Sequence, residues 1–259
     1  MVKAPTARRN NRNSKKGFPH ANSRPLRGAA IDLADFSNRY HSNFIVKTRD
    51  NSEVADQYLK GLFQANKKNM ERMVEAVPNS DDQRYQHFLS NSTWGEDDVI
   101  EQVALDANCL IGGKPDSFLL IDETGIPKKG DKSVGVSRQY CGELGKVDNC
   151  QVGVFTALGH KDSVVPVDCR LFLPRNWTDD PSRCREAGVP DEHIEFHRKH
   201  DLALQMIIMA RARGLEYNWI GFDALYGEDP AFLRFLDEIG EVFMGDVHTD
   251  QRIYLQDPE

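Results

Sequence analysis

Two short apolar runs, each ending in an aspartate, constrain the fold of this chain more than any other feature. The first is SFLLID at residues 117–122, and the second is NWIGFD at residues 218–223. Apolar runs of this length bounded by turn residues are typical of buried β-strands. Because β-rich and helical patterns alternate between and after the two runs, the sequence predicts an α/β domain in which both acids follow strands of one sheet.

The remaining segments of this domain follow from the same patterns. Three β-rich stretches with glycine-rich turns predict an antiparallel meander after the first strand, and the next stretch is irregular and polar. Apolar residues at helical spacing predict two helices, and a final apolar run predicts a strand. In chain order, these segments are 134–142, 149–159, 164–174, 175–190 (irregular), 191–213 (helix), 229–240 (helix) and 241–247.

The first hundred residues carry a helical pattern instead. Residues 52–77 have apolar side chains at a spacing near 3.6 and predict one helix that ends before Pro78, with further helices at 82–92 and 96–110. A turn-rich break follows at residues 112–115. We therefore expect three parts, namely a basic, largely disordered arm (1–49), a helical domain (50–113) and an α/β core (114–259).

Charge is distributed unevenly between these parts. The net charge of −7 by itself disfavours nucleic-acid binding, but residues 1–49 hold 11 Lys and Arg against 2 Asp and Glu. A basic arm can contact phosphates while an acidic body performs chemistry. A solvated tail without a partner would have the same composition, so both interpretations stay open for this arm.

Composition also limits the class of protein. No stretch approaches the roughly 20 apolar residues of a membrane span, and no apolar run follows the basic N-terminus as in a secretory signal. The five cysteines are odd in number and contain no C-x-x-C pair, which argues against a disulfide framework and a zinc ribbon. We expect a cytoplasmic protein with reduced thiols and no membrane partner.

The two strand-end acids, Asp122 and Asp223, predict a shared site. Side chains at strand ends of an α/β sheet collect at its binding edge. Carboxylate oxygens suit Mg²⁺, which keeps several waters and needs few protein ligands. Two such ions about 4 Å apart can activate an attacking oxygen and stabilise a leaving oxygen of a phosphodiester. An aspartate after a strand often only caps a turn or the next helix, and that alternative remains.

Several long motifs resemble one family, the IS701-like transposases of the DDE superfamily endonucleases, which are related to the IS4 type. FLLIDETGIPKKGDKSVGVSRQYCGELGKVDNCQVGVF resembles the region of the first acid, and FHRKHDLALQMIIMARARGLEYNWIGFDALYGED resembles that of the second. RLFLPRNWTDDPSRCREAGVP resembles the stretch between the third strand and the long helix. YLKGLFQANKKNMERMVEAVPNSDDQRYQHFLSNSTWGEDDV, residues 58–99, resembles its helical N-terminal domain, so the resemblance covers about residues 50–250.

This resemblance implies a fold and an activity. The fold is an RNase H-like core, a mixed sheet with helices, preceded by a helical DNA-binding domain. The activity is metal-dependent strand cleavage and transfer at insertion-sequence ends. Asp122 and Asp223 would be catalytic metal ligands for Mg²⁺, with Mn²⁺ as a possible substitute. The partner would be double-stranded DNA, both insertion-sequence ends and target, bound by a homodimer.

The family's third acid, a glutamate on a later helix, has no match among the residues after Asp223. We therefore expect an incomplete core, as in a C-terminally truncated transposase. One alternative is a non-catalytic DNA-binding fragment or inhibitor of a full-length transposase. Another is an unrelated metal-dependent phosphohydrolase, although the basic arm and the absence of an Asp-x-Asp pair at the first strand count against it.

A few further side chains are candidates for contacts with DNA. Lys128, Lys129 and Lys132 follow the first acid, and Arg138 lies on the next strand; a solvated hairpin face is the alternative. A basic stripe on the first strong helix is the second candidate group, consisting of Lys60, Lys67, Lys68 and Arg72. Glu123 should point to the side of the sheet opposite Asp122, which makes it a weaker candidate metal ligand.

Overall fold

The chain forms two compact units, which are described separately. The computed structural model describes residues 26–249, so residues 1–25 of the expected basic arm lie outside the described residues. The expected disorder is wrong for residues 26–49, which form helical and strand elements of the first unit. The first unit ends at Trp94 and the second begins at Gly95. No helix within the described range has both the length and the apolar character that crossing a bilayer requires.

The first unit is built mainly from short helices around an aromatic core. Tyr85 and Phe88 are buried, and Trp94 stacks on Phe88 with ring centroids 5.4 Å apart. Val54 and Met73 complete the contact between neighbouring helices. The elements in chain order are α1 (Leu26–Arg39), η1 (His41–Phe44), β1 (Ile45–Val46), β2 (Arg49–Asp50), α2 (Ser52–Gln64), α3 (Met70–Ala76) and α4 (Asp82–Ser90).

The single helix predicted over 52–77 is wrong, because the chain breaks it into α2 and α3. Ala65 ends α2 in an extended conformation, with φ −73° and ψ 135°. Asn69 then caps α3, its side chain accepting a hydrogen bond from the backbone N–H of Arg72. An asparagine that satisfies a free N–H favours a helix start over a helix interior, and the regular apolar spacing hid this break.

The second unit contains the α/β core and one helix more than expected. Helix α5 packs on strands β5 and β6, so it belongs to this unit and not to the helical region expected up to residue 113. The elements are α5 (Glu96–Ile111), β3 (Phe118–Pro127), β4 (Ser137–Cys141), β5 (Lys146–His160), β6 (Ser163–Leu171), α6 (Arg175–Thr178), α7 (Pro181–Glu186), η2 (Asp191–His193), α8 (Lys199–Ala212), β7 (Trp219–Phe222), α9 (Ala224–Gly227), α10 (Pro230–Glu238) and β8 (Phe243–Gly245).

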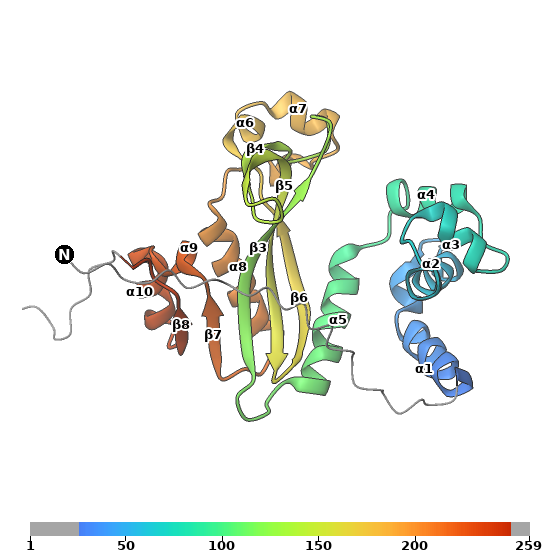
Figure 1. The fold of residues 1–259 in the computed structure, drawn as a ribbon, viewed down its shortest axis with the longest axis horizontal. Coiled ribbons are helices and arrows are strands. Elements are labelled where there is room, and N and C mark those ends of the chain that lie inside the picture. The colour runs from blue at the N-terminus through green and yellow to red at the C-terminus, as the bar shows by residue number, and fades with distance from the viewer. Residues whose placement is uncertain (1–25, 250–259) are drawn as a thin grey trace, which may run out of the picture. The chain divides into compact units, whose positions relative to one another are not determined.

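The sheet of this unit has the order β4-β5-β3-β7-β8, with β6 also paired to β5. β5 runs antiparallel to its three neighbours, whereas β7 runs parallel to both β3 and β8. An antiparallel meander followed by two parallel strands that are reached through helices is the predicted RNase H-like arrangement, and this mixed fold is confirmed (Figure 1).

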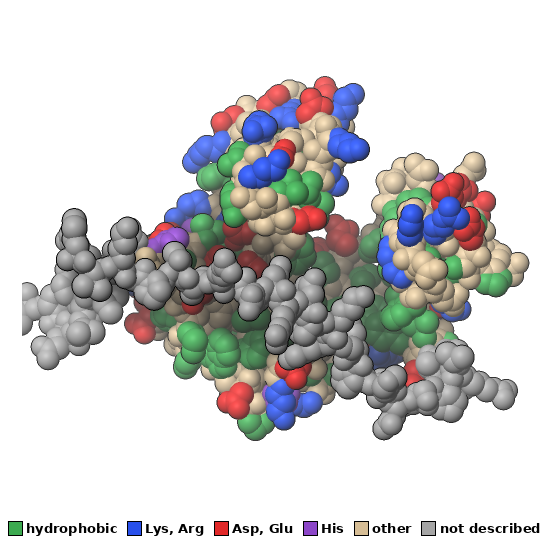
Figure 2. Space-filling model, viewed as in Figure 1, with side chains coloured by type: hydrophobic (Ala, Val, Ile, Leu, Met, Phe, Trp, Pro, Cys, Tyr) green, Lys and Arg blue, Asp and Glu red, His purple; other side chains and the backbone are tan. Residues whose placement is uncertain are grey.

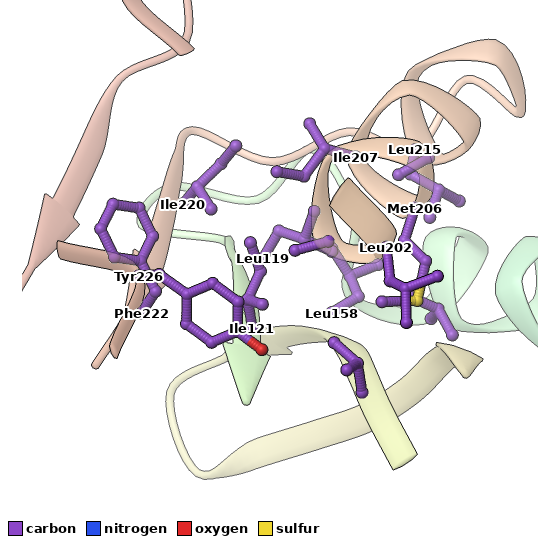
Figure 3. Packing of buried hydrophobic residues seen from close by; sticks show 14 of the residues in the cluster. Leu119, Ile121, Leu158, Leu202, Met206, Ile207, Leu215, Ile220, Phe222 and Tyr226 are labelled. Carbon is purple, nitrogen blue, oxygen red and sulfur yellow. The ribbon is translucent and has the colours of Figure 1, made fainter. Parts of the chain in front are cut away.

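One face of the sheet carries the core. Leu119 and Ile121 of β3 point toward the same cluster as Met206 and Ile207 of α8, and all four are buried (Figure 3). Side chains of α5 and α10 belong to this cluster too. Alternation along β3 therefore places Phe118, Leu120 and Asp122 on the other face.

We call the part of the sheet that packs on this cluster, with α5, α8 and α10, the body. The distal part of the sheet differs from the body. β3 pairs with β7 from Phe118 to Ile121. Residues 122–127 then continue past the end of β7 and pair with β5 alone (Figure 1). β4, the 128–136 loop, α6 and α7 surround this end, which we call the distal end. The segment 175–190, expected to be irregular, forms α6 and α7 there. The helix expected to begin at residue 191 begins at Lys199, after a short 3₁₀ turn.

Candidate active site

The two predicted acids come together at the ends of adjacent parallel strands. Ile121 of β3 is directly opposite Phe222 of β7, and Asp122 and Asp223 are the next residues on their strands. Both follow core-facing residues, so both belong to the sheet face opposite the core. Asp223 also begins α9, where its side chain accepts a hydrogen bond from the backbone N–H of Leu225 at 3.0 Å.

The charge on this pair has no cationic partner in the described part of the chain. Asp122 and Asp223 are exposed, and their side chains accept hydrogen bonds only from the backbone N–H groups of Glu123 and Leu225. Two nearby acids form ion pairs instead: Glu123 with Lys199 (2.8 Å) and Asp229 with Arg198 (2.8 Å). Two adjacent, uncompensated carboxylates make a local site that favours a cation.

A cluster of three polar side chains lies on the core side of Asp122 and Asp223. Lys199, the first residue of α8, is only about one-fifth exposed and binds one carboxylate oxygen of Glu123. The second oxygen of Glu123 and the hydroxyl of Tyr226 are buried without a hydrogen-bond partner. Burial, followed by the charges of Glu123, Asp223 and Asp122, raises the pKa of Tyr226 far above its usual value. Tyr226 thus stays neutral behind the pair.

The donor set suits a hard divalent cation. Carboxylate oxygens are the ligands that Mg²⁺ prefers, and an exposed pair leaves room for the waters that this ion retains. Within residues 26–249, no group of three His, Cys, Asp or Glu side chains is arranged to hold a metal. The described part of the chain therefore offers Asp122 and Asp223 for a metal, since Glu123 faces the core side and is neutralised by Lys199.

The predicted basic residues of the core lie at its distal end. Lys128 follows β3 directly, with its backbone N–H bonded to the carbonyl of Asn149 at 2.9 Å. Arg138 is directly opposite Asn149 on β4, so Lys128, Asn149 and Arg138 form one row across three strands. Residues in one row share a face, and alternation along β3 makes it the face of Asp122. Lys129 and Arg138 are exposed.

The predicted basic stripe does not lie on a single helix. Lys60 lies on α2 and forms an ion pair with Asp56 at 2.5 Å. Lys67 and Lys68 lie in the link between α2 and α3, and Lys68 donates a hydrogen bond to the carbonyl of Ala65. A contact of these three lysines with DNA therefore stays a prediction, with one cation on α2 and two in the link.

Lys199 and Tyr226 were missed by the sequence analysis. Lys199 is 76 positions from Glu123, so no local pattern connects them. A lysine in the first turn of a helix opposes the helix dipole, and this was the one available signal. Tyr226 follows Asp223 by three residues and resembled an ordinary apolar residue of a turn.

Comparison with known proteins agrees with this architecture. The sequence profile of the family described as DDE superfamily endonuclease matches residues 44–259. A curated relative from Microchaete diplosiphon, named "Probable transposase for insertion sequence element IS701", is 30% identical over 179 residues. The aligned part is 67% of this chain and 42% of that protein, so the chain spans about two fifths of its relative's length. The expected resemblance to the IS701 group is confirmed.

Proposed function

Because the chain belongs to the DDE superfamily endonuclease family, we propose that Asp122 and Asp223 form a site for metal-dependent cleavage of DNA. One observation carries this proposal: two exposed carboxylates end adjacent parallel strands and have no cationic partner among the described residues. The similarity to an IS701 transposase supports a more specific role, cleavage at insertion-sequence ends and transfer of the strand to target DNA.

The two aspartates would hold Mg²⁺, or Mn²⁺ in its place. Such ions activate the attacking oxygen and stabilise the leaving oxygen of a phosphodiester. The contribution of the chain is to hold both carboxylates in place, through the strand register and the backbone N–H groups of Glu123 and Leu225. Lys199 forms an ion pair with Glu123 on the core side, and so neutralises the charge of Glu123 next to the two aspartates.

The proposed partner is double-stranded DNA, both insertion-sequence ends and target. Lys128, Lys129 and Arg138 would contact it near the catalytic core, and Lys60, Lys67 and Lys68 would do so from the helical unit. Joining two DNA ends in one reaction requires two active sites, so we infer a homodimer on DNA. We propose a cytoplasmic location for this activity.

Nicking of supercoiled plasmid with Mg²⁺ or Mn²⁺ tests the catalytic part. Asp122→Asn and Asp223→Asn remove the charge and retain an oxygen for the backbone N–H groups, so folding should persist. We expect each to lower the nicking rate by about 10²–10³-fold, the typical loss for a group that stabilises transition-state charge. Asp237→Asn, an exposed acid on α10, is the matched control and should nick at the wild-type rate.

Two other outcomes point elsewhere. A wild-type chain that binds DNA but nicks with neither metal would favour the alternative function, a non-catalytic DNA-binding fragment or inhibitor of a full-length transposase. The presence of only two candidate ligands in the described part of the chain gives this alternative its support. Nicking that survives in both aspartate variants would contradict the proposed site.

A further inference from the structure

The loop between β3 and β4, residues 128–136, is held by side chains that donate to its carbonyl groups. Asn149 of β5 donates to the carbonyls of Lys128 (2.9 Å) and Gly130 (2.8 Å). The other donors come from four further residues: Arg183 to Asp131 (2.8 Å), Gln151 to Val134 (2.6 Å), Trp177 to Val136 (2.7 Å) and Gln139 to Gly135 (3.4 Å). Water usually satisfies the carbonyls of exposed loops, so this loop is unusually fixed.

The short helices α6 and α7 provide the firmest of these restraints. Trp177 is fully buried, and the guanidinium of Arg183 stacks over its ring at 3.8 Å. The indole N–H and the guanidinium therefore reach the loop from one rigid unit. A loop that is ordered before binding loses little conformational entropy when a ligand arrives.

This fixed loop carries unpaired positive charge. Lys128, Lys129, Lys132 and Arg138 have no ion-pair partner in the structure as described, and Asp131 is the one acid among residues 128–138. The nearby Asp148 is already neutralised by Lys146 at 2.8 Å. Figure 2 shows Lys and Arg side chains gathered at the distal end, over β4, α6 and α7. A polyanion would neutralise this charge.

The distance between the loop and the carboxylates can be expressed as a length of DNA. Lys128 is six residues beyond Asp122 on the same sheet face, which at about 3.3 Å per residue is about 20 Å. Phosphates of one strand of B-DNA recur about every 3.4 Å along the helix axis. For a duplex whose axis runs along β3, the distance corresponds to about six base pairs, and because the duplex turns once in about 10 base pairs, the phosphates that face the loop belong to either strand.

We propose that the 128–136 loop and Arg138 form a preformed site for the phosphate backbone of duplex DNA, about six base pairs along the duplex from the bond cut at Asp122 and Asp223. The six-base-pair spacing rests on the proposed function, because it needs a cutting site as its reference. The phosphate contact itself does not depend on catalysis.

Affinity for a labelled random-sequence duplex, measured with the full chain at several salt concentrations, tests the contact. K128Q/K129Q/R138Q should weaken binding at least about tenfold near 0.1 M salt and reduce the salt slope by about 2–3. K114Q/K161N/R234Q removes three cations elsewhere in the same unit and is the charge-matched control, which should bind like the wild type. Equal binding by the two triple variants would overturn the contact.

Crosslinking tests the spacing. A benzophenone amino acid placed at Lys129, the exposed neighbour of Lys128, is photocrosslinked to duplex DNA, Mg²⁺ or Mn²⁺ is added, and both the crosslinked base and the new nick are mapped on the same molecules. We expect a separation of about six base pairs. A separation that is scattered, or longer than about 12 base pairs, overturns the placement. A chain that crosslinks without nicking overturns the proposed catalysis and this spacing, while the affinity comparison still decides the contact.

Discussion

The two ends of β3 are stabilised in different ways. Residues 118–121 lie between β5 and β7, with a large apolar cluster from α5, α8 and α10 against one face. Beyond Asp122 the strand leaves β7, and the buried cluster there consists of Cys141, Cys150 and Val152. Directed hydrogen bonds to loop carbonyls supply the remaining order. The carboxylates lie at the transition between the two regions, so a rigid body holds them while charged residues accumulate at the distal end.

The largest effect is expected from a cavity in the body. Leu119→Ala removes a fully buried side chain from the main cluster and should lower the free energy of unfolding by about 2–5 kcal/mol. Urea unfolding followed by hydrogen exchange in peptides of β3 and α8 measures this unit alone. Leu110→Ala, at an exposed position, should change it by less than about 0.5 kcal/mol. Equal effects would contradict a body that depends on apolar burial.

A second prediction concerns the ion pair at the transition. Lys199→Met leaves a mostly buried Glu123 carboxylate without its partner and should cost about 1–3 kcal/mol, less than for a fully buried pair because both side chains remain partly exposed. The double variant Glu123→Gln with Lys199→Met should recover part of this loss, since no unpaired charge remains. The single variants Lys199→Met and Glu123→Gln are measured alongside. If the loss of stability in the double variant equals the sum of the two single losses, the ion pair contributes nothing.

The distal end gives a third prediction. Trp177→Phe keeps most of the buried aromatic volume but leaves the Val136 carbonyl without its donor, which should cost about 1–2 kcal/mol. Hydrogen exchange should increase in residues 128–136 more than in β7. Trp219→Phe is the control, because Trp219 contacts Phe118 through its ring and no described hydrogen bond uses its indole N–H. Unchanged hydrogen exchange in the loop would mean that the hydrogen bond from Trp177 to the carbonyl of Val136 does not order it.

The sequence predicted the body well because its signals are local. SFLLID and NWIGFD each contain a strand and the acid that follows it, and their pairing needed only the rule that parallel strands of one sheet share an edge. Helix boundaries were less accurate. Two local signals were concealed by the regular apolar spacing. One is Asn69 as a cap within residues 52–77, and the other is Asp201, whose carboxylate accepts a hydrogen bond from the backbone N–H of Arg198 at the start of α8.

The distal end could not be predicted in the same way. The indole N–H of Trp177 bonds to a carbonyl 41 positions earlier in the chain, and Arg183 to one 52 positions earlier. Such contacts depend on where the sheet and two short helices meet, and no periodicity encodes that. The lysines of the loop were identified as candidates, whereas the restraints that fix their backbone became visible only in three dimensions.

The smallest expected effect comes from a helix cap, and it tests whether polar contacts also stabilise the body. Asp229 caps α10 by accepting hydrogen bonds from Ala231 and Phe232 and pairs with Arg198. Burial alone would raise its pKa, but these N–H groups, with His200 and Arg198, hold the pKa of Asp229 below its usual value. Asp229→Ala should therefore cost about 1 kcal/mol at neutral pH.

The pH dependence of that cost separates the charge of Asp229 from its shape. A carboxyl with a lowered pKa stabilises the folded state above its unfolded pKa of about 3.9, and the contribution is lost as the pH falls through the folded value. The difference in stability between wild type and Asp229→Ala should thus be full at pH 6–7 and shrink below about pH 4. Asp229→Asn keeps a capping oxygen without the charge, so it should be intermediate at neutral pH and should retain its remaining cap when acidified. A constant difference between wild type and Asp229→Ala from pH 7 to pH 3 would mean that the hydrogen bonds accepted by the side chain, and not its charge, stabilise the start of α10.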